Sequence, residues 1–318
     1  MADAGEKGAA ASSSKESRPE WMQRRERGSL FWALVMCRLS LWFGRRLTRP
    51  ILYGIALYFT LAVPKARHAS RTYLQRALGR PAGWRDVYRH VLTFASTIHD
   101  RIYLLHGDEN LFRFEWHGEN ALYASHARGS GLFLFGAHLG SFEAMRSLAR
   151  ANPQFKVGLA MYPDNAQQVN RMLAAVNPGV IEDVIALGQL DSMLRVHALL
   201  EEGAMVGILA DRASGNDNYQ RVSFLGEPAH FPTGPFRMAA MLRQPVFFMA
   251  GLYCGGNHYE IHFEQIADFA ELRREERSEA VQRAVAAYAG VLEKHCYRRP
   301  YNWFNFFDFW ESAGDDKE

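Results

Sequence analysis

The sequence has few cysteines and no long apolar run. Its three cysteines, Cys37, Cys254 and Cys296, lie far apart without the paired spacing of a metal site, which indicates packing residues in a reducing compartment. The longest apolar stretch, residues 51–63, has 13 residues between two prolines. Because a membrane-spanning helix needs roughly 20 residues, this stretch predicts surface attachment rather than a crossing.

Several catalytic signatures are also missing. There is no Gly-x-Ser-x-Gly elbow, which argues against a serine-type lipase, and no His-Glu-x-x-His or Cys/His cluster, which argues against a zinc enzyme. No recognised nucleic-acid-binding module is present, so nucleic acid is not an expected partner. We expect no metal and no cofactor. A lipid hydrolase and a non-catalytic lipid-binding or scaffold protein remain open as alternative functions.

Length and composition predict one large α/β domain with an appendage. The chain has 318 residues, of which 48% are hydrophobic, enough for a sizeable core. Residues 1–19 are small and polar without aromatics, and predict a disordered tail. Residues 20–64 are expected to form membrane-associating helices, and residues 65–318 the catalytic domain. The first residues lack the positively charged segment followed by an apolar segment that is typical of a secretory signal, so we expect the domain to stay in the cytoplasm.

Basic residues gather near the start of the chain. Residues 21–90 carry 14 Lys or Arg against two acids, although the whole chain has a net charge of only +3. Whole-turn spacings would place several arginines along one stripe of a helix, opposite apolar residues, as in a helix lying in a bilayer interface. The arginines are Arg27, Arg38, Arg45 and Arg49, and the apolar side chains are Phe31, Trp32, Leu34 and Phe43. A single membrane pass and a basic core helix remain the alternatives.

The remainder alternates strand and helix patterns. Apolar strands are expected at residues 132–135, 155–160, 180–186 and 204–210, with helices at residues 166–176 and 191–200 between them. Residues 247–253 and 259–263 should be closing strands, and residues 281–295 a final helix. This order predicts a mostly parallel central sheet flanked by helices.

One stretch in this sheet has the features of an active site. The buried-type strand at residues 132–135 is followed by Gly136, His138, Gly140 and Ser141, and then by a helical pattern. This places an imidazole at the carboxyl end of a strand beside a helix N-terminus, where open α/β sheets bind ligands. Backbone amides around Gly140, with a nearby basic group, would then hold an oxyanion.

His138 and Glu143 are five residues apart, which would put them on different faces of one helix. If His138 precedes the helix, Glu143 can reach back to the ring, fix its tautomer and leave the other nitrogen to accept a proton from a hydroxyl. Asp211 ends the strand at residues 204–210 and should emerge at the same edge, although a simple turn aspartate is an equal alternative. Residues 212–231 are expected to form a loop that covers the site.

These segments resemble a known family. Gly136-Ala-His138-x4-Glu143 is similar to the His-x4-Asp/Glu block of the glycerolipid (lysophospholipid) acyltransferase superfamily. The order of the later segments resembles the bacterial lauroyl/myristoyl acyltransferases of lipid A synthesis, over about residues 21–310. Those segments are Tyr162-Pro-Asp-Asn165, Asp211, Val222-Ser-Phe-Leu-Gly-Glu-Pro228, Phe231-Pro-Thr-Gly-Pro235 and Tyr301-Asn-Trp-Phe304.

The resemblance implies a glycerolipid acyltransferase-like fold and transfer of a fatty acyl group from a thioester to a hydroxyl of a membrane-associated lipid or glycolipid. The donor would be acyl carrier protein or coenzyme A, and the location the cytoplasmic face of a bacterial inner membrane. Tyr162 stands where lipid A enzymes commonly have an arginine, so the acceptor can differ, for example another envelope lipid or a polyene.

Roles follow for individual residues. His138 would be the base, Glu143 its orienting carboxylate, and Asp211 a further catalytic residue. Substrate contacts are expected from Gly140, Ser141, Tyr162, Asn165, Arg171, Arg212 and Arg237, although each of the three arginines could equally be a surface residue. The aromatic ending at residues 301–310 should pack back near the acyl site or the membrane surface.

Overall fold

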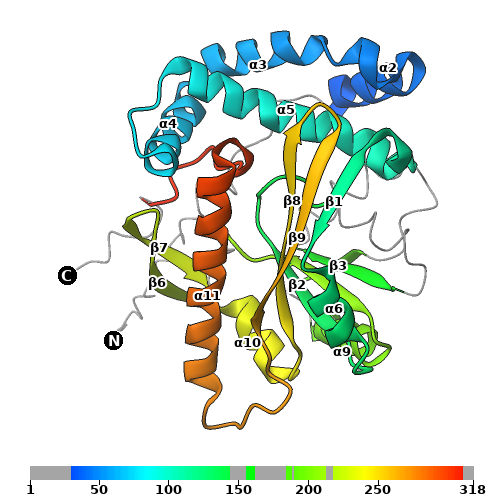
Figure 1. The fold of residues 1–318 in the computed structure, drawn as a ribbon, viewed down its shortest axis with the longest axis vertical. Helices are drawn as coiled ribbons and strands as arrows, with labels where there is room; N and C mark the ends of the chain where they lie inside the picture. The colour runs from blue at the N-terminus through cyan, green and yellow to red at the C-terminus, as the bar shows by residue number, and fades with distance from the viewer. Residues whose placement is uncertain (1–29, 144–154, 162–183, 188–189, 213–217, 311–318) are drawn as a thin grey trace, which may run out of the picture.

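A seven-stranded sheet forms the centre of the molecule (Figure 1). The structure is a computed structural model, and it describes residues 30–143, 155–161, 184–187, 190–212 and 218–310. The sheet has the order β1-β9-β8-β2-β5-β3-β4, and among its neighbouring pairs only β8 and β9 run antiparallel. The strands are β1 Arg113–His117, β2 Leu132–Gly136, β3 Val157–Met161, β4 Val184–Ala186, β5 Met205–Leu209, β8 Val246–Gly255 and β9 His258–Ala267. The predicted α/β class with a mostly parallel sheet is confirmed.

Strand β2 lies between two hydrophobic layers. Phe133 and Phe135 belong to one core cluster, whereas Leu132 and Leu134 belong to the other, and all four are fully buried. Helices α9, α10 and α11 pack in the first cluster, and α6 with the C-terminal half of α5 in the second. A strand covered on both faces needs apolar side chains at every position, which is the pattern that β2 shows. These helices are α6 Glu119–His126, α9 Leu190–Glu201, α10 Gly234–Met241 and α11 Arg277–Arg298, with short turns η1 Glu109–Leu111 and η3 Pro300–Asn302.

Four helices precede or cross the top of the sheet in Figure 1: α2 Leu30–Thr48, α3 Ile51–Ala62, α4 Pro64–Leu78 and α5 Trp84–His106. Gly44 kinks α2, with a φ of 77°. Helix α3 lies between Pro50 and Pro64, which limit its length. Within the described residues, no helix is both long and apolar enough to cross a membrane.

The predicted outward orientation of the arginine stripe is wrong for Arg45 and Arg49. Arg45 and Arg49 point inward and share the buried carboxylate of Asp100 on α5, at 2.7 and 3.0 Å. The outward side of this segment is instead apolar: Trp42 is 85% exposed and Leu47 71%. The kink at Gly44 and the buried carboxylate turn the arginines toward the protein. Of the other stripe residues, Arg38 and Phe43 are exposed, whereas Arg27 and the side chains of Phe31, Trp32 and Leu34 lie outside the described residues.

The expected loop over residues 212–231 is also wrong in part. Strands β6 Tyr219–Phe224 and β7 Glu227–Pro232 form an antiparallel hairpin. Its tight turn contains Leu225 and Gly226, both with positive φ, which the sequence pattern did not predict. The predicted helices at residues 166–176 and directly after Ser141 fall largely outside the described residues.

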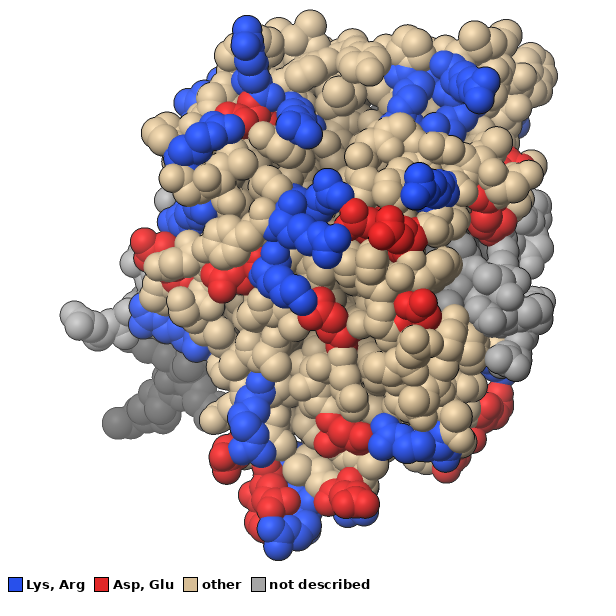
Figure 2. Space-filling model, viewed as in Figure 1, with Lys and Arg blue, Asp and Glu red and all other residues tan. Residues whose placement is uncertain are grey.

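Charge is unevenly distributed on the face in Figure 2. Lys and Arg predominate over its upper part, where Figure 1 has the helices α2 to α5, and Asp and Glu lie mostly lower. The described part of the basic excess, residues 30–90, therefore lies beside the apolar outer side of α2 and α3.

Candidate active site

The turn after β2 is fixed by two distant segments of the chain. The backbone N–H of Phe304 donates to the carbonyl of His138 at 2.7 Å, and the N–H of Gly140 donates to the carbonyl of Asn302 at 2.8 Å. Ser141 donates its N–H to the carbonyl of Gly251 in β8 at 2.7 Å. The backbone that carries His138 is therefore held between the C-terminal segment and the neighbouring strand.

Gly140 has to be glycine at this point. Its φ is +69°, and a Cβ atom would lie 2.0 Å from the carbonyl oxygen of Gly251. The predicted role of its amide is wrong, however, because the N–H groups of Gly140 and Ser141 already donate to carbonyls of Asn302 and Gly251. These two amides cannot also hold an oxyanion without breaking those bonds.

His138 is paired with Asp211. The ring Nδ1 lies 2.9 Å from Asp211 Oδ1, and the backbone N–H of His138 donates to Oδ2 at 3.0 Å. The indole Nε1–H of Trp303 also donates to Oδ2, at 3.2 Å. Asp211 follows β5, which pairs in parallel with β2 so that Leu209 lies opposite Gly136. The prediction that Asp211 and His138 emerge at one edge of the sheet is confirmed.

The surroundings of the pair favour a neutral ring beside a charged carboxylate. Asp211 is fully buried, which opposes ionisation, but the charge and hydrogen bonds of His138 and the charge of Arg212 outweigh burial and lower the pKa of Asp211. Desolvation and the charge of Arg212 lower the pKa of His138, against the opposing effect of Asp211. With Nδ1–H donating to the carboxylate, Nε2 is left as an acceptor, and the His138 side chain is 32% exposed. The arrangement can take a proton from a bound hydroxyl.

Glu143 is placed differently from the prediction. Its carboxylate forms an ion pair with Arg101 of α5 and lies 3.4 Å from the hydroxyl of Ser141. Within the described part of the chain, no hydrogen bond or ion pair joins Glu143 to His138. The predicted orienting contact from Glu143 is therefore wrong in this structure, because a carboxylate from the adjacent strand end already occupies Nδ1.

Comparison with known proteins identifies the family of this chain. Residues 20–312 match the family model of the bacterial lipid A biosynthesis acyltransferases. The chain belongs to this family. It is therefore an acyltransferase, and the family is typically membrane-associated. A search of the curated proteins finds no match.

Arg212 follows Asp211 directly and lies beside the pair in this acyltransferase. Its Nη2 donates to the carbonyl of Phe304 at 2.9 Å, its Nε lies 4.0 Å from Asp211 Oδ2, and its guanidinium lies 4.6 Å from the ring centre of Phe307. The Nε group is buried and has no hydrogen-bond partner among the residues that the structure describes. Arg212 thus has a donor to offer close to His138.

The other predicted contacts are not brought to the site. Arg237 is exposed on α10, and no described contact links it to His138 or Asp211. Tyr162, Asn165 and Arg171 lie outside the residues that the structure describes.

Sequence reasoning missed Trp303 and Arg101 as parts of the site of this acyltransferase. The aromatic ending was a usable signal for Trp303, since it was predicted to pack back near the acyl site or the membrane surface, and its indole is fully buried and donates to Asp211. Nothing in the sequence marked Arg101, because its partner Glu143 lies 42 positions away along the chain.

One group of possible metal ligands lies on strands β1 and β9. Potential ligand atoms of His117, Glu260 and His262 all lie within 4.8 Å of one another. The two imidazoles are stacked with an interplanar angle of 9°, and Glu260 is paired with Arg298 and Arg299. Stacked rings cannot direct their lone pairs at one point, so these contacts account for the cluster without an ion.

Proposed function

We propose that this acyltransferase moves a fatty acyl group from an acyl thioester, carried by acyl carrier protein or coenzyme A, to a hydroxyl of a membrane-associated lipid or glycolipid. The observation that carries the proposal is the His138–Asp211 pair at the exposed end of a buried strand, with the ring Nε2 left as an acceptor. The family match supports the reaction class, acyl transfer in lipid A biosynthesis.

The proposed reaction needs a general base and charged groups of the kind found at this site. His138 Nε2 takes the proton of the acceptor hydroxyl while its oxygen attacks the thioester carbonyl. The tetrahedral intermediate then collapses, the carbon–sulfur bond breaks, and the leaving thiolate takes the proton back from His138. The products are an ester and a free thiol, without a covalent enzyme intermediate.

Asp211 and Arg212 support this reaction electrostatically. Asp211 holds the ring in the required tautomer and stabilises the imidazolium that forms, as its bond to Nδ1 allows. We assign the oxyanion of the intermediate to the guanidinium of Arg212, whose buried Nε has no hydrogen-bond partner within the described part of the chain, in place of the amides at Gly140 and Ser141.

The location we propose is the cytoplasmic face of the inner membrane, with attachment to the bilayer surface. Supporting this, large apolar side chains project from α2 and α3 into solvent, more than a folded domain leaves exposed without use. They include Trp42, Phe43, Leu47, Tyr53, Tyr58 and Leu61.

Radiolabelled lauroyl-acyl carrier protein and lauroyl-coenzyme A, each incubated with total bacterial lipid and the purified protein, test the function. We expect label to enter a lipid that becomes heavier by one acyl group, and His138→Ala to stop this. His68→Ala is the matched control, because His68 is exposed on α4. Label transfer that survives His138→Ala, or label released only as free fatty acid, would contradict the proposal.

A further inference from the structure

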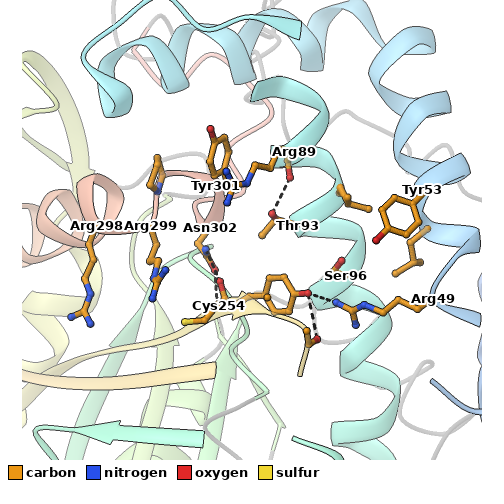
Figure 3. Close-up of a pocket in the computed structure, with 16 residues that line it drawn as sticks. Arg49, Tyr53, Arg89, Thr93, Ser96, Cys254, Arg298, Arg299, Tyr301 and Asn302 are labelled. Carbon is orange, nitrogen blue, oxygen red and sulfur yellow. Dashed lines mark hydrogen bonds between the residues drawn. The ribbon is translucent and has the colours of Figure 1, made fainter. Parts of the chain in front are cut away.

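A cavity of about 420 Å³ lies between α3, α5, the tip of the β8–β9 hairpin and the C-terminal segment (Figure 3). Four arginines line it, Arg49, Arg89, Arg298 and Arg299, and no acidic residue does. Its volume is in the range of small-molecule sites. The mechanism proposed above uses none of these arginines.

The positive charge around the cavity is only partly neutralised. Arg49 shares the carboxylate of Asp100 with Arg45, and Arg298 shares that of Glu260 with Arg299. Among the described residues, Arg89 has no carboxylate partner and lies over the ring of Tyr301, 4.4 Å from its centre. The carboxylates of Asp100 and Glu260 are therefore shared by four arginines, and Arg89 is a fifth arginine without a carboxylate in the described part of the chain. A bound anion would supply the negative charge that these arginines lack.

Polar groups accompany this charge. Ser96, Tyr253 and the consecutive positive-φ glycines Gly255 and Gly256 lie in the wall, and the Tyr253 hydroxyl accepts from Arg49 and donates to the carbonyl of Gly256. Arginine guanidinium groups, with their several N–H donors, match the acceptor oxygens of a phosphate group.

The cavity also adjoins an apolar surface and the active site. Leu52 and Tyr53 in its wall belong to α3, whose outer side exposes Leu57 and Leu61. On the other side, Asn302 lines the cavity and accepts the N–H of Gly140, two residues after His138. A ligand with a charged head and an apolar body fits this setting.

We propose that the cavity binds the phosphate-bearing head group of a membrane amphiphile, the lipid acceptor of the reaction. The role of this ligand as the acceptor rests on the proposed function, whereas the binding of a phosphate-bearing amphiphile does not.

Calorimetric titration of the full-length protein in a neutral detergent tests the binding. The probes are dihexanoyl phosphatidic acid, dihexanoyl phosphatidylcholine and inorganic phosphate. We expect the phosphomonoester lipid to bind more tightly than the other two. Arg89→Gln should weaken that binding about tenfold or more, because it removes a charge-assisted hydrogen bond.

Arg85→Gln is the matched control, since Arg85 is exposed one turn earlier on α5 and does not line the cavity. Arg298→Gln is a second test variant that leaves Glu260 paired with Arg299. Binding to wild type that neither variant weakens would overturn the proposal. So would equal affinity for inorganic phosphate, which would make the site one for a free anion.

The binding result is separable from the proposed function. His138→Ala should bind the phosphomonoester lipid as wild type does. Normal acyl transfer together with Arg89-independent binding would overturn the cavity assignment alone. Arg89-dependent binding without any acyl transfer would overturn the proposed reaction alone.

Discussion

At the residue scale, the observed partner of His138 is Asp211, whereas the sequence spacing suggested Glu143. We expect Asp211→Asn to lower the acylation rate by about 10³–10⁴-fold, because an amide NH₂ facing Nδ1 forces the ring proton onto Nε2. Initial rates of labelled lipid formation measure this, with Asp191→Asn on the exposed side of α9 as control. A wild-type rate in Asp211→Asn would make Asp211 a structural turn residue.

The acidic limb of the pH–rate profile reports the same ring. The pKa of His138 is lowered by desolvation and by Arg212, and only the neutral ring is a base. We therefore expect kcat/KM to rise with pH through an apparent pKa below about 6.5, the ordinary value for histidine, and to be level at neutral pH. Glu143→Gln should leave that apparent pKa in place, because Glu143 is paired with Arg101. A kcat/KM that falls as pH rises from 5 to 7 would contradict a histidine base.

His138 and Asp211 were predictable because both end apolar strands, and the ends of parallel strands meet at one sheet edge. The role of Glu143 was not predictable, because sequence spacing does not tell which carboxylate contacts the Nδ1 atom of His138. That outcome depends on the register of β5 against β2 and on Arg101, which comes from a helix far away in the chain.

At the element scale, α5 joins the N-terminal helices to the sheet. Asp100 accepts from Arg45, Arg49 and the hydroxyl of Tyr259, and its side chain is fully buried. The neighbouring Arg101 pairs with Glu143 beside the active site. The same turn of α5 therefore holds the kinked α2 segment and a part of the catalytic turn.

We expect Asp100→Asn to lower the free energy of unfolding by about 3 kcal/mol, because it leaves two partly buried arginines without their carboxylate. Urea denaturation followed by circular dichroism measures the change. Glu279→Gln is the control: its pair with Arg283 is solvent-exposed and should contribute less than about 0.5 kcal/mol. Equal effects of the two substitutions would mean that Asp100 does not anchor these helices.

Elements with strong apolar patterns were predicted close to their true bounds, as β2, α9 and β8 show. The β6–β7 hairpin was missed because its strands contain Gln, Arg, Ser and two prolines, with little apolar alternation. Its pairing depends on packing against α11 and the aromatic ending, where Phe224 and Phe231 are fully buried. Contacts between segments so far apart in the chain cannot be predicted from the local sequence.

At the scale of the whole molecule, Arg45 and Arg49 face inward, whereas large apolar side chains of α2 and α3 face outward. Membrane binding should therefore depend more on Trp42 and Leu47 than on Arg45 and Arg49. We expect Trp42→Ser and Leu47→Ser each to weaken binding to neutral vesicles about tenfold, from lost apolar burial. Vesicle co-sedimentation at low and high salt measures this.

Leu194→Ser is the control for that experiment, since Leu194 is 65% exposed on α9, away from the N-terminal helices. If it weakens binding as much as Leu47→Ser does, the attachment surface lies elsewhere. If high salt releases the wild-type protein completely, charge rather than apolar insertion holds it at the membrane.

The central claim is that His138 and Asp211 act as one unit in acyl transfer, and a double-mutant cycle tests it most directly. The measurement is the rate of labelled lipid formation by wild type, His138→Ala, Asp211→Asn and the double variant. We predict that the double variant is no slower than His138→Ala alone, because Asp211 affects the proton transfer through the ring. Independent losses that multiply in the double variant would contradict the account.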